Sequence, residues 1–492
     1  MEHGNDNDFF DEDDGRGEDD DLDEEDDHLS DDDMSVEDDN DNDDDLMLIE
    51  RNDPGLLIFD IVSGYHPPDG WEILGESIGR NTMLNEVNII YEPLSELGMH
   101  FFRGLAKNRS IKKLSFFISN RVRGDLLLYL IPFFMNNTSF ESLRFRLIYL
   151  NGSEAPSEGR FDSLEYALEQ FNWLKELRME IFGRIEGAEN VIQALSGHTG
   201  LRELHLFGAQ MGKEGFNNLA VMLLNPSCSL STLCLKGQSD IDDEMANILS
   251  SGLNGNGTLT ELDLSGSLGC TRLTAIGWHA IFDPLKSATC MINTLNLGSN
   301  HISDTAVPSI ISALSNNATI KDLKLSIMKN SNAFLQAMIQ FLQSPSCMLE
   351  SIALAQNSLD DEKIESLANA LANNCRLKKL NLWGNRSVTP VGWHTLFQLL
   401  QRPSCELESL DIGNNNLTDE TVRSLASAIS NGSSLRELEL SYNRDVSSAA
   451  WQVLIIALRL HAPALEMLGM YAVDNGLIDS CAVLLTDNHW NV

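Results

Sequence analysis

The chain has 492 residues, of which 42% are hydrophobic, and a formal net charge of −40 at neutral pH. This charge repels nucleic-acid phosphate and anionic lipid, so we expect neither a nucleic acid nor a membrane as partner. The longest apolar run, from Leu126 to Met135, is about half of what a bilayer span requires. The acidic start of the sequence is the opposite of a secretory signal, which predicts a cytoplasmic or nuclear protein.

The first 50 residues are the most acidic segment, with 27 aspartate and glutamate residues and one arginine. Few apolar residues are available there to offset the entropy of ordering the chain, so we predict that residues 1–50 are a disordered acidic tail. The charge of the tail favours basic proteins as partners. A tail that only keeps the protein in solution is the alternative interpretation.

A repeated pattern follows, predicted to occupy residues 84–476 after an N-terminal capping segment, residues 51–83, with a helix from Trp71 to Gly79. Each repeat contains apolar-x-x-apolar-x-apolar, a polar turn and an amphipathic stretch with apolar residues three or four apart. The pattern predicts a strand, a turn and a helix in every repeat. Its first apolar positions recur about every 29 residues and are Leu84, Ile111, Phe140, Leu174, Leu201, Leu230, Leu259, Ile292, Ile320, Leu349, Leu377, Leu407, Leu435 and Leu465.

In several repeats an asparagine stands eight residues after the first apolar position. A side-chain amide there can bond backbone groups of its own turn and the next, so we interpret it as structural. These residues are Asn300, Asn357, Asn385, Asn415 and Asn443. In four other repeats this position holds a different residue: Ala209, Gln238, Ser267 or Met328. We therefore expect the N-terminal arch to be less regular.

Tryptophans and cysteines also recur at fixed places. Trp278, Trp393 and Trp451 lie near helix starts at multiples of two repeats, which predicts a core position. Five cysteines precede a first apolar position by two residues and are expected to be reduced packing residues rather than metal ligands. They are Cys228, Cys290, Cys347, Cys375 and Cys405.

Three further segments lie outside the regular pattern. Residues 477–492 are predicted to be a C-terminal capping helix, Leu477 to Leu485, and a tail. Two insertions, Asn151 to Arg160 and Ser265 to Arg272, fall where a strand gives way to a helix. Such insertions carry binding or are neutral loops, and the sequence favours neither.

Two kinds of repeat alternate. In one kind the segment before the strand contains Ser-Cys, as in "LLQRPSCELESLDI". In the other kind the segment before the strand reads as in "NNCRLKKL" or "NGSSLREL". This alternation of long repeats resembles the ribonuclease-inhibitor-like leucine-rich-repeat superfamily, over about Trp71 to Leu485. The resemblance implies an α/β leucine-rich-repeat solenoid: a right-handed horseshoe with a parallel inner sheet, outer helices and about 14 repeats. That superfamily includes inhibitors, immune-receptor sensor regions and Ran GTPase-activating proteins.

Strand residues between the apolar positions should point onto the inner face, where equivalent positions stack as columns. One column is Ser115, Arg144, Arg178 and His205, and the next is Phe117, Arg146, Glu180, Phe207 and Lys236. Stacked arginines with aromatic neighbours suggest an anionic or amphipathic ligand. The later repeats place Asp263, Asp322, Asp411, Glu437 and Glu439 there, with Trp383 and Tyr471 exposed among them. The alternative is a solvated face on which Glu176 and Glu180 screen the arginines.

The sequence has no G-x-x-x-x-G-K loop, no H-E-x-x-H and no G-x-S-x-G motif, so we predict no enzyme activity, cofactor or metal. The leading hypothesis is a non-catalytic interaction scaffold or regulator that binds a protein partner on the concave face. One alternative is a Ran-type GTPase-activating protein, although in those proteins the acidic segment follows the repeats. The other is an acidic histone-chaperone-like binder of basic proteins, in which the tail is the active part.

Overall fold

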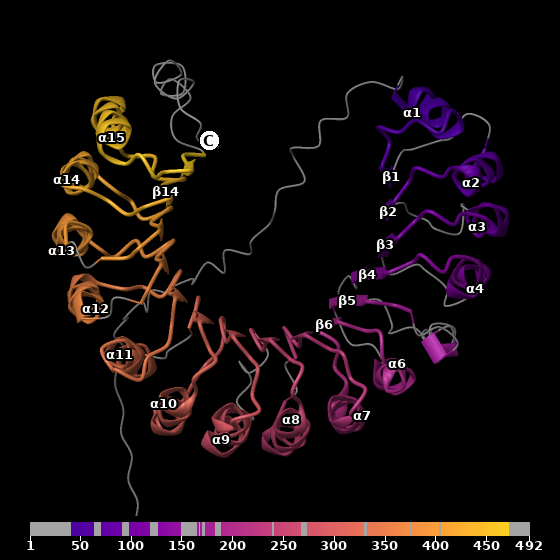
Figure 1. The fold of residues 1–492 in the computed structure, drawn as a ribbon, viewed down its shortest axis with the longest axis horizontal. Coiled ribbons are helices and arrows are strands. Elements are labelled where there is room, and N and C mark those ends of the chain that lie inside the picture. Colours follow the sequence, from indigo (N-terminus) through magenta and orange to yellow (C-terminus); the bar gives the residue numbers. More distant parts are fainter. Residues whose placement is uncertain are drawn as a thin grey trace, which may run out of the picture.

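The computed structural model describes residues 41–62, 70–90, 98–118, 126–148, 165–166, 168–169, 173–182, 188–238, 241–266, 273–328, 332–373, 376–402 and 405–471. Its strands form one 15-stranded sheet in which every neighbouring pair is parallel and the strands follow in chain order. Figure 1 shows the strands on the inside of an open horseshoe and the helices on its outside. The leucine-rich-repeat solenoid is therefore confirmed.

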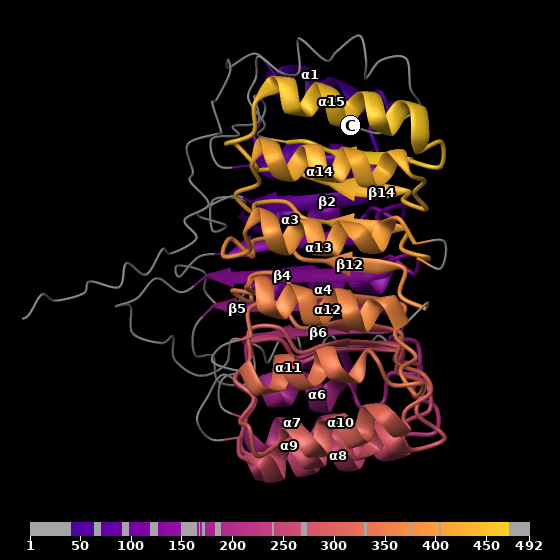
Figure 2. The same ribbon diagram turned by 90° about the vertical axis from the view of Figure 1, so that its left-hand side faces the viewer.

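Strands and helices alternate along the described chain, except that only residues 165–166 and 168–169 are described as helical between β4 and β5. In side view the helices stack as successive layers (Figure 2). The strands are β1 Ile58–Val62, β2 Glu86–Ile90, β3 Lys113–Ile118, β4 Ser142–Ile148, β5 Glu176–Phe182, β6 Glu203–Phe207, β7 Thr232–Cys234, β8 Glu261–Asp263, β9 Thr294–Asn296, β10 Asp322–Lys324, β11 Ser351–Ala353, β12 Lys379–Asn381, β13 Ser409–Asp411, β14 Glu437–Glu439 and β15 Met467–Gly469. The helices are α1 Asp41–Glu50, α2 Trp71–Arg80, α3 Gly98–Leu105, α4 Leu126–Asn136, α6 Ala188–Leu195, α7 Gly212–Leu224, α8 Asp243–Gly255, α9 Ala275–Phe282, α10 Val307–Asn316, α11 Asn332–Phe341, α12 Asp361–Asn373, α13 Pro390–Leu400, α14 Asp419–Ser430 and α15 Ser448–His461, with a 3-10 turn η2 Pro284–Lys286.

The array begins earlier than the sequence predicts. β1 lies in the segment assigned to the cap, and α1 lies in the segment assigned to the tail. Leu46 and Ile49 of α1 are buried, and the Asn81 amide donates to the Ile49 carbonyl at 2.9 Å. The apolar residues at the end of the acidic segment therefore find a surface to cover, which an isolated tail would lack. The helix from Trp71 is accordingly a repeat helix between β1 and β2.

Several predicted segments lie outside the described residues. These are the acidic segment 1–40, the insertion Asn151 to Arg160, most of the insertion Ser265 to Arg272, and the C-terminal segment 477–492. In the helices that the structure does describe, length and apolar character together are insufficient for a bilayer crossing.

The predicted core positions are confirmed. All 14 first apolar positions are buried in one hydrophobic cluster between the sheet and the helices. Trp278, Trp393 and Trp451 are also buried there. Cys228, Cys290 and Cys347 are buried in this core and Cys405 packs against it, while Cys375 is outside the described residues.

The recurring turn asparagine forms a ladder between repeats. Asn385 is buried; its amide donates to the carbonyls of Leu354 and Leu382 at 3.0 Å each. Its Oδ1 accepts the backbone N–H groups of Asn357 and Leu359 at 3.0 and 3.1 Å. The amide thus joins its own turn to the preceding repeat, not to the next one as the sequence suggested. The Leu382 carbonyl also accepts from the Asn415 amide at 3.1 Å, so Asn385 matters most to the other three buried backbone groups.

The early repeats differ for a visible reason. Their ninth residues include Ile148 and Phe182, and β4 and β5 continue through these positions. Gln238 nevertheless replaces the asparagine in part, because its amide donates to the Leu206 carbonyl at 2.7 Å. The inner sheet is wider in the N-terminal arch, where β1 to β6 have five to seven residues, than from β7 onwards, where the strands have three.

Candidate functional site on the concave face

The strand register brings the predicted columns together. Ser115, Arg144, Arg178 and His205 are consecutive partners across β3 to β6, and Phe117, Arg146, Glu180 and Phe207 form the next column. Lys236 continues that column, because the Gly208 N–H donates to its carbonyl. Trp383, Asp411, Glu437, Glu439 and Tyr471 lie on β12 to β15 or at their ends. The predicted residues therefore form two separate groups, at opposite arms of the horseshoe (Figure 1).

In the N-terminal group the arginines are paired with glutamates. Arg144 Nη2 lies 2.9 Å from Glu176 Oε1, and its Nε donates to the same oxygen at 3.0 Å. Arg178 Nε donates to Glu180 Oε1 at 2.6 Å, and Arg146 Nε lies 3.7 Å from Glu180 Oε2. Each arginine thus has a glutamate neighbour on the face itself, although Arg146 and Arg178 share Glu180. This arrangement matches the alternative interpretation, in which the glutamates screen the arginines.

Aromatic rings bracket the arginines of this group. The Arg146 guanidinium lies 5.9 Å from the centre of the Phe117 ring. Lys236 Nζ lies 4.7 Å from the centre of the Phe207 ring. Both cations can therefore gain from the electron-rich ring faces. The N-terminal group is a mixed surface of paired charges and half-buried rings.

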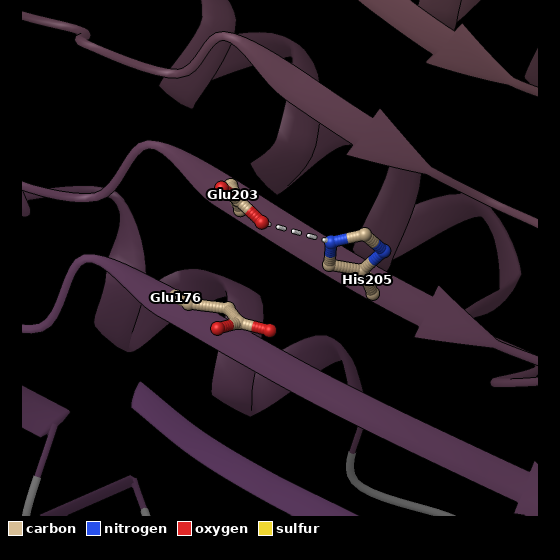
Figure 3. Close-up of side chains that lie close together, drawn as sticks. All are labelled: Glu176, Glu203 and His205. Carbon is tan, nitrogen blue, oxygen red and sulfur yellow. Dashed lines mark ion pairs between the residues drawn. The ribbon is translucent and has the colours of Figure 1, made fainter. Parts of the chain in front are cut away.

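Three side chains of this group could reach one cation (Figure 3). One ligand atom from each of Glu176, Glu203 and His205 lies within 4.8 Å of the others. His205 Nε2 is 3.6 Å from Glu203 Oε2. Glu176, however, already accepts from Arg144 and, at 2.8 Å, from the Ser142 hydroxyl. A metal ion would have to compete with that arginine, so we assign the trio to the ion-pair network.

The C-terminal group surrounds a shallow hollow of about 410 Å³. Asp411 and Glu439 are register partners on β13 and β14. Asp411 accepts the Gly413 N–H at 3.0 Å, and Glu439 accepts the Ser441 N–H at 2.8 Å. Within the described ranges, neither carboxylate lies in an ion pair. Two adjacent carboxylates thus face the hollow with no cation between them.

Aromatic residues flank these carboxylates. Trp383 lies over Gly413, where a Cβ would come within 2.8 Å of the indole Cδ1, so glycine is required for this position of the ring. Tyr471 is 71% exposed and packs edge-on against Tyr442, with ring centres 5.5 Å apart. Tyr471 is therefore exposed as the sequence predicts, whereas Trp383 is half-buried. Aromatic residues beside polar groups are typical of protein-binding surfaces.

Sequence reasoning missed two lysines of this hollow. Lys324 and Lys379 line it together with the carboxylates. Lys379 Nζ lies 3.4 Å from Glu437 Oε2, two strands away. The signal was available, because both lysines occupy outward strand positions equivalent to those of the acidic residues. The C-terminal arch is therefore less uniformly acidic than predicted, and Glu437 is a paired residue.

Asp411 carries the clearest electrostatic perturbation on this face. Burial, and secondarily the neighbouring Glu439 carboxylate, raise the pKa of Asp411 from 3.8 to about 6, although hydrogen bonds from Gly413 and Asn381 act in the opposite direction. The folded state therefore holds a proton that the unfolded state releases between about pH 4 and 6. Stability must fall as pH rises through this window.

We expect Asp411→Asn to raise the melting temperature at pH 7 and to leave it nearly unchanged near pH 4. Asparagine cannot ionise but keeps an oxygen for the Gly413 N–H. Thermal melts of the wild type and the variant across pH 4 to 7 measure the difference. Asp445→Asn, at an exposed aspartate, is the control. Equal destabilisation of the Asp411 variant at both ends of the range would contradict the assignment.

Known proteins show the same repeat. A family model described as "Leucine Rich repeat" matches residues 404–426. The "NACHT, LRR and PYD domains-containing protein 12" of Homo sapiens is 27% identical over 296 residues, 60% of this chain and 26% of that protein. The ribonuclease inhibitor of Sus scrofa is 30% identical over 247 residues, 50% of this chain and 53% of that protein. The chain therefore spans about a quarter of the first relative and about half of the second.

Among solved structures, a chain from the crystal structure of the yeast Rad7 and Elc1 complex covers 76% of this chain with a TM-score of 0.43 and 17% identity. The parallel inner sheet, the outer helices and the turn asparagines define a leucine-rich-repeat protein. Within that class, the chain resembles the ribonuclease-inhibitor-like leucine-rich-repeat proteins, since the ribonuclease inhibitors of Sus scrofa and Mus musculus are both 30% identical to it over about half of its length.

Proposed function

We propose that the chain is a non-catalytic protein-binding scaffold whose C-terminal arch holds a basic segment of a partner protein. The observation that carries this proposal is the adjacent pair Asp411 and Glu439, which faces the hollow of about 410 Å³ without an ion pair among the described residues. A lysine or arginine side chain placed there would relieve the repulsion between the two carboxylates. Such charge-assisted contacts are among the stronger polar interactions.

The aromatic residues support the same kind of partner. Trp383 offers a ring face beside the carboxylates, and Tyr471 and Tyr442 offer apolar edges at the end of the array. Rings next to carboxylates suit a long cationic side chain, whose stem is apolar and whose head is charged. The N-terminal group, with its compensated arginines, would then contribute shape and polar contacts rather than net charge.

The compartment and the tail belong to this proposal as well. We place the protein in the cytoplasm or the nucleus, where free thiols such as those of Cys228, Cys290 and Cys405 persist. Residues 1–40 would add long-range attraction for a basic partner. The acidic-chaperone alternative instead assigns the activity to that segment. The described residues offer no specific observation in favour of a Ran-type activity.

The test compares partner capture from cells by tagged full-length variants, with quantification by mass spectrometry. We expect Asp411→Asn with Glu439→Gln to lose a basic partner that the wild type retains. Glu365→Gln with Glu420→Gln, on exposed positions of α12 and α14, is the matched control and should retain it. Capture that survives the concave-face substitutions but disappears on deletion of residues 1–40 would contradict the proposal and favour the tail.

A further inference from the structure

The edge of the sheet where the chain enters each strand carries a row of charges, formed by the second residue of every repeat. From Lys321 onwards the signs alternate regularly, through Lys321, Glu350, Lys378, Glu408, Arg436 and Glu466. The side chains pair accordingly, with N···O distances of 2.7 Å for Lys321 and Glu350, 3.7 Å for Lys378 and Glu408, and 2.5 Å for Arg436 and Glu466. We call these second residues the edge row.

The backbone keeps the members of the edge row side by side. The N–H of Glu350 donates to the Lys321 carbonyl, and the N–H of Lys378 donates to the Glu350 carbonyl, both at 2.8 Å. The same bonds join Lys175, Arg202 and Ser231 in the N-terminal half. Neighbouring residues of the edge row can therefore form an ion pair only when their charges are opposite. Where two neighbours carry the same charge, or one is neutral, that ion pair cannot form.

The alternation is interrupted between Lys175 and Lys321, because Ser231, Thr260 and Asn293 in that stretch are neutral. Lys175 follows Glu141 and pairs with it at 2.6 Å, but the next member of the row is a second cation, Arg202, and the one after it is the neutral Ser231. Among the residues that the structure describes, no carboxylate lies within ion-pair distance of Arg202. Lys175, Lys112 and Arg202 all lower the pKa of the Glu141 carboxyl, Lys175 most of all. Three cations thus share one carboxylate.

A hollow of about 470 Å³ lies where the row breaks. Its lining consists of Trp173, Lys175, Thr199, Gly200, Arg202, Ser229 and Ser231. Trp173, Gly200 and Ser229 directly precede the first apolar positions of three successive repeats. Gly200 has no side chain, so it leaves a gap between the other two. Arg202 and Lys175 stand on its rim, and three hydroxyl groups surround it.

We propose that this hollow binds a phosphate group carried by a side chain of a partner protein. A phosphate offers three strongly accepting oxygens and a charge near −2, which match one guanidinium, one ammonium and several hydroxyl donors better than a carboxylate does. The Ser231 hydroxyl is already directed to the Arg202 carbonyl at 3.0 Å, so Thr199 and Ser229 are the hydroxyls that donate to the ligand. Trp173 provides an apolar wall for the stem of the phosphorylated residue.

This site is distinct from the concave face of the proposed function. It lies on the edge of the sheet, and it selects a negative group, whereas the hollow at Asp411 selects a positive one. A cationic site on a chain of net charge −40 has to depend on local contacts, because the long-range field opposes an anion. Binding should therefore weaken as salt screens Arg202 and Lys175.

The test measures the binding of a fluorescent, otherwise uncharged peptide with one phosphoserine to the full chain by anisotropy. The same peptide without the phosphate group, and inorganic phosphate, are the two control probes. We expect the phosphopeptide to bind more tightly than either probe, and Arg202→Ser to weaken it by at least about tenfold, the effect of losing one charge-assisted contact. Arg436→Ser, at the same row position in a paired repeat, should bind as the wild type does.

Three results would overturn the proposal. The first is no phosphate-dependent binding at millimolar peptide. The second is equal weakening by Arg202→Ser and Arg436→Ser, which would indicate a general charge effect. The third is inorganic phosphate binding as tightly as the peptide, which would indicate a site for a small anion. Both arginines are exposed, so thermal melts of the two variants should match the wild type and exclude unfolding as the cause.

Discussion

Replacing Asn385 by alanine should lower the free energy of unfolding by about 3–5 kcal/mol, since an unsatisfied buried polar group costs about 1–3 kcal/mol and several are created at once. The substitution removes two donated bonds, to Leu354 and Leu382, and two accepted ones, from Asn357 and Leu359. Water cannot replace them readily, because Asn385 is fully buried. Urea denaturation followed by circular dichroism measures the loss.

Asn316→Ala is the control for this prediction. Asn316 lies on the exposed side of α10 and donates only to the Ser312 carbonyl of its own helix, at 2.8 Å. Its removal should change stability by less than about 0.5 kcal/mol, as is usual for surface positions. A loss at Asn385 no larger than that at Asn316 would mean that the ladder does not hold the repeats together.

Truncating Trp393 to alanine should also cost about 3–5 kcal/mol, because it leaves a large cavity in the core. Trp393 is 1% exposed, and its ring packs on Phe397 with 6.1 Å between centres. Each repeat of a solenoid contacts only its neighbours, so the loss should be local. Hydrogen exchange should show faster opening in the repeats around α13 than in the N-terminal arch.

Trp393→Phe separates packing from hydrogen bonding. The Trp393 Nε1 is buried and has no hydrogen-bond partner among the described residues, so phenylalanine loses volume but none of the polar contacts that the structure describes. We expect the phenylalanine variant to lose less than half of what the alanine variant loses. Equal losses for the two variants would show that the indole N–H, and not the filled volume, stabilises this layer.

Much of the fold followed from the sequence because a solenoid is governed by local rules. The spacing of Leu377, Leu407 and Leu435 predicts buried strand residues, and all three are buried. The alternation of side chains along a strand also predicted which residues face inwards. Parallel register then had to stack Arg144 on Arg178 and Asp411 on Glu439, as observed. Periodicity was sufficient for these predictions, because each repeat meets only copies of itself.

The start of the array could not be predicted in this way. The acidic sequence before Leu46 suggested a tail as far as residue 50, but α1 lies against α2 and buries Leu46 and Ile49. Short apolar segments gain from burial only when a neighbouring surface exists, and composition alone does not reveal that surface. The same applies to β1, which is stabilised by its pairing with β2.

The character of the inner and edge surfaces was decided by the tertiary structure. The sequence showed arginines on the inner face, but only the positions of their long side chains show that Glu176 and Glu180 compensate them. The sequence also contained the edge row, yet the position of Arg202 beside a hollow, with no ion pair to a described residue, emerges only when successive repeats are stacked. Periodicity determines which positions become neighbours; the lengths and rotamers of the charged side chains determine which of those neighbours pair.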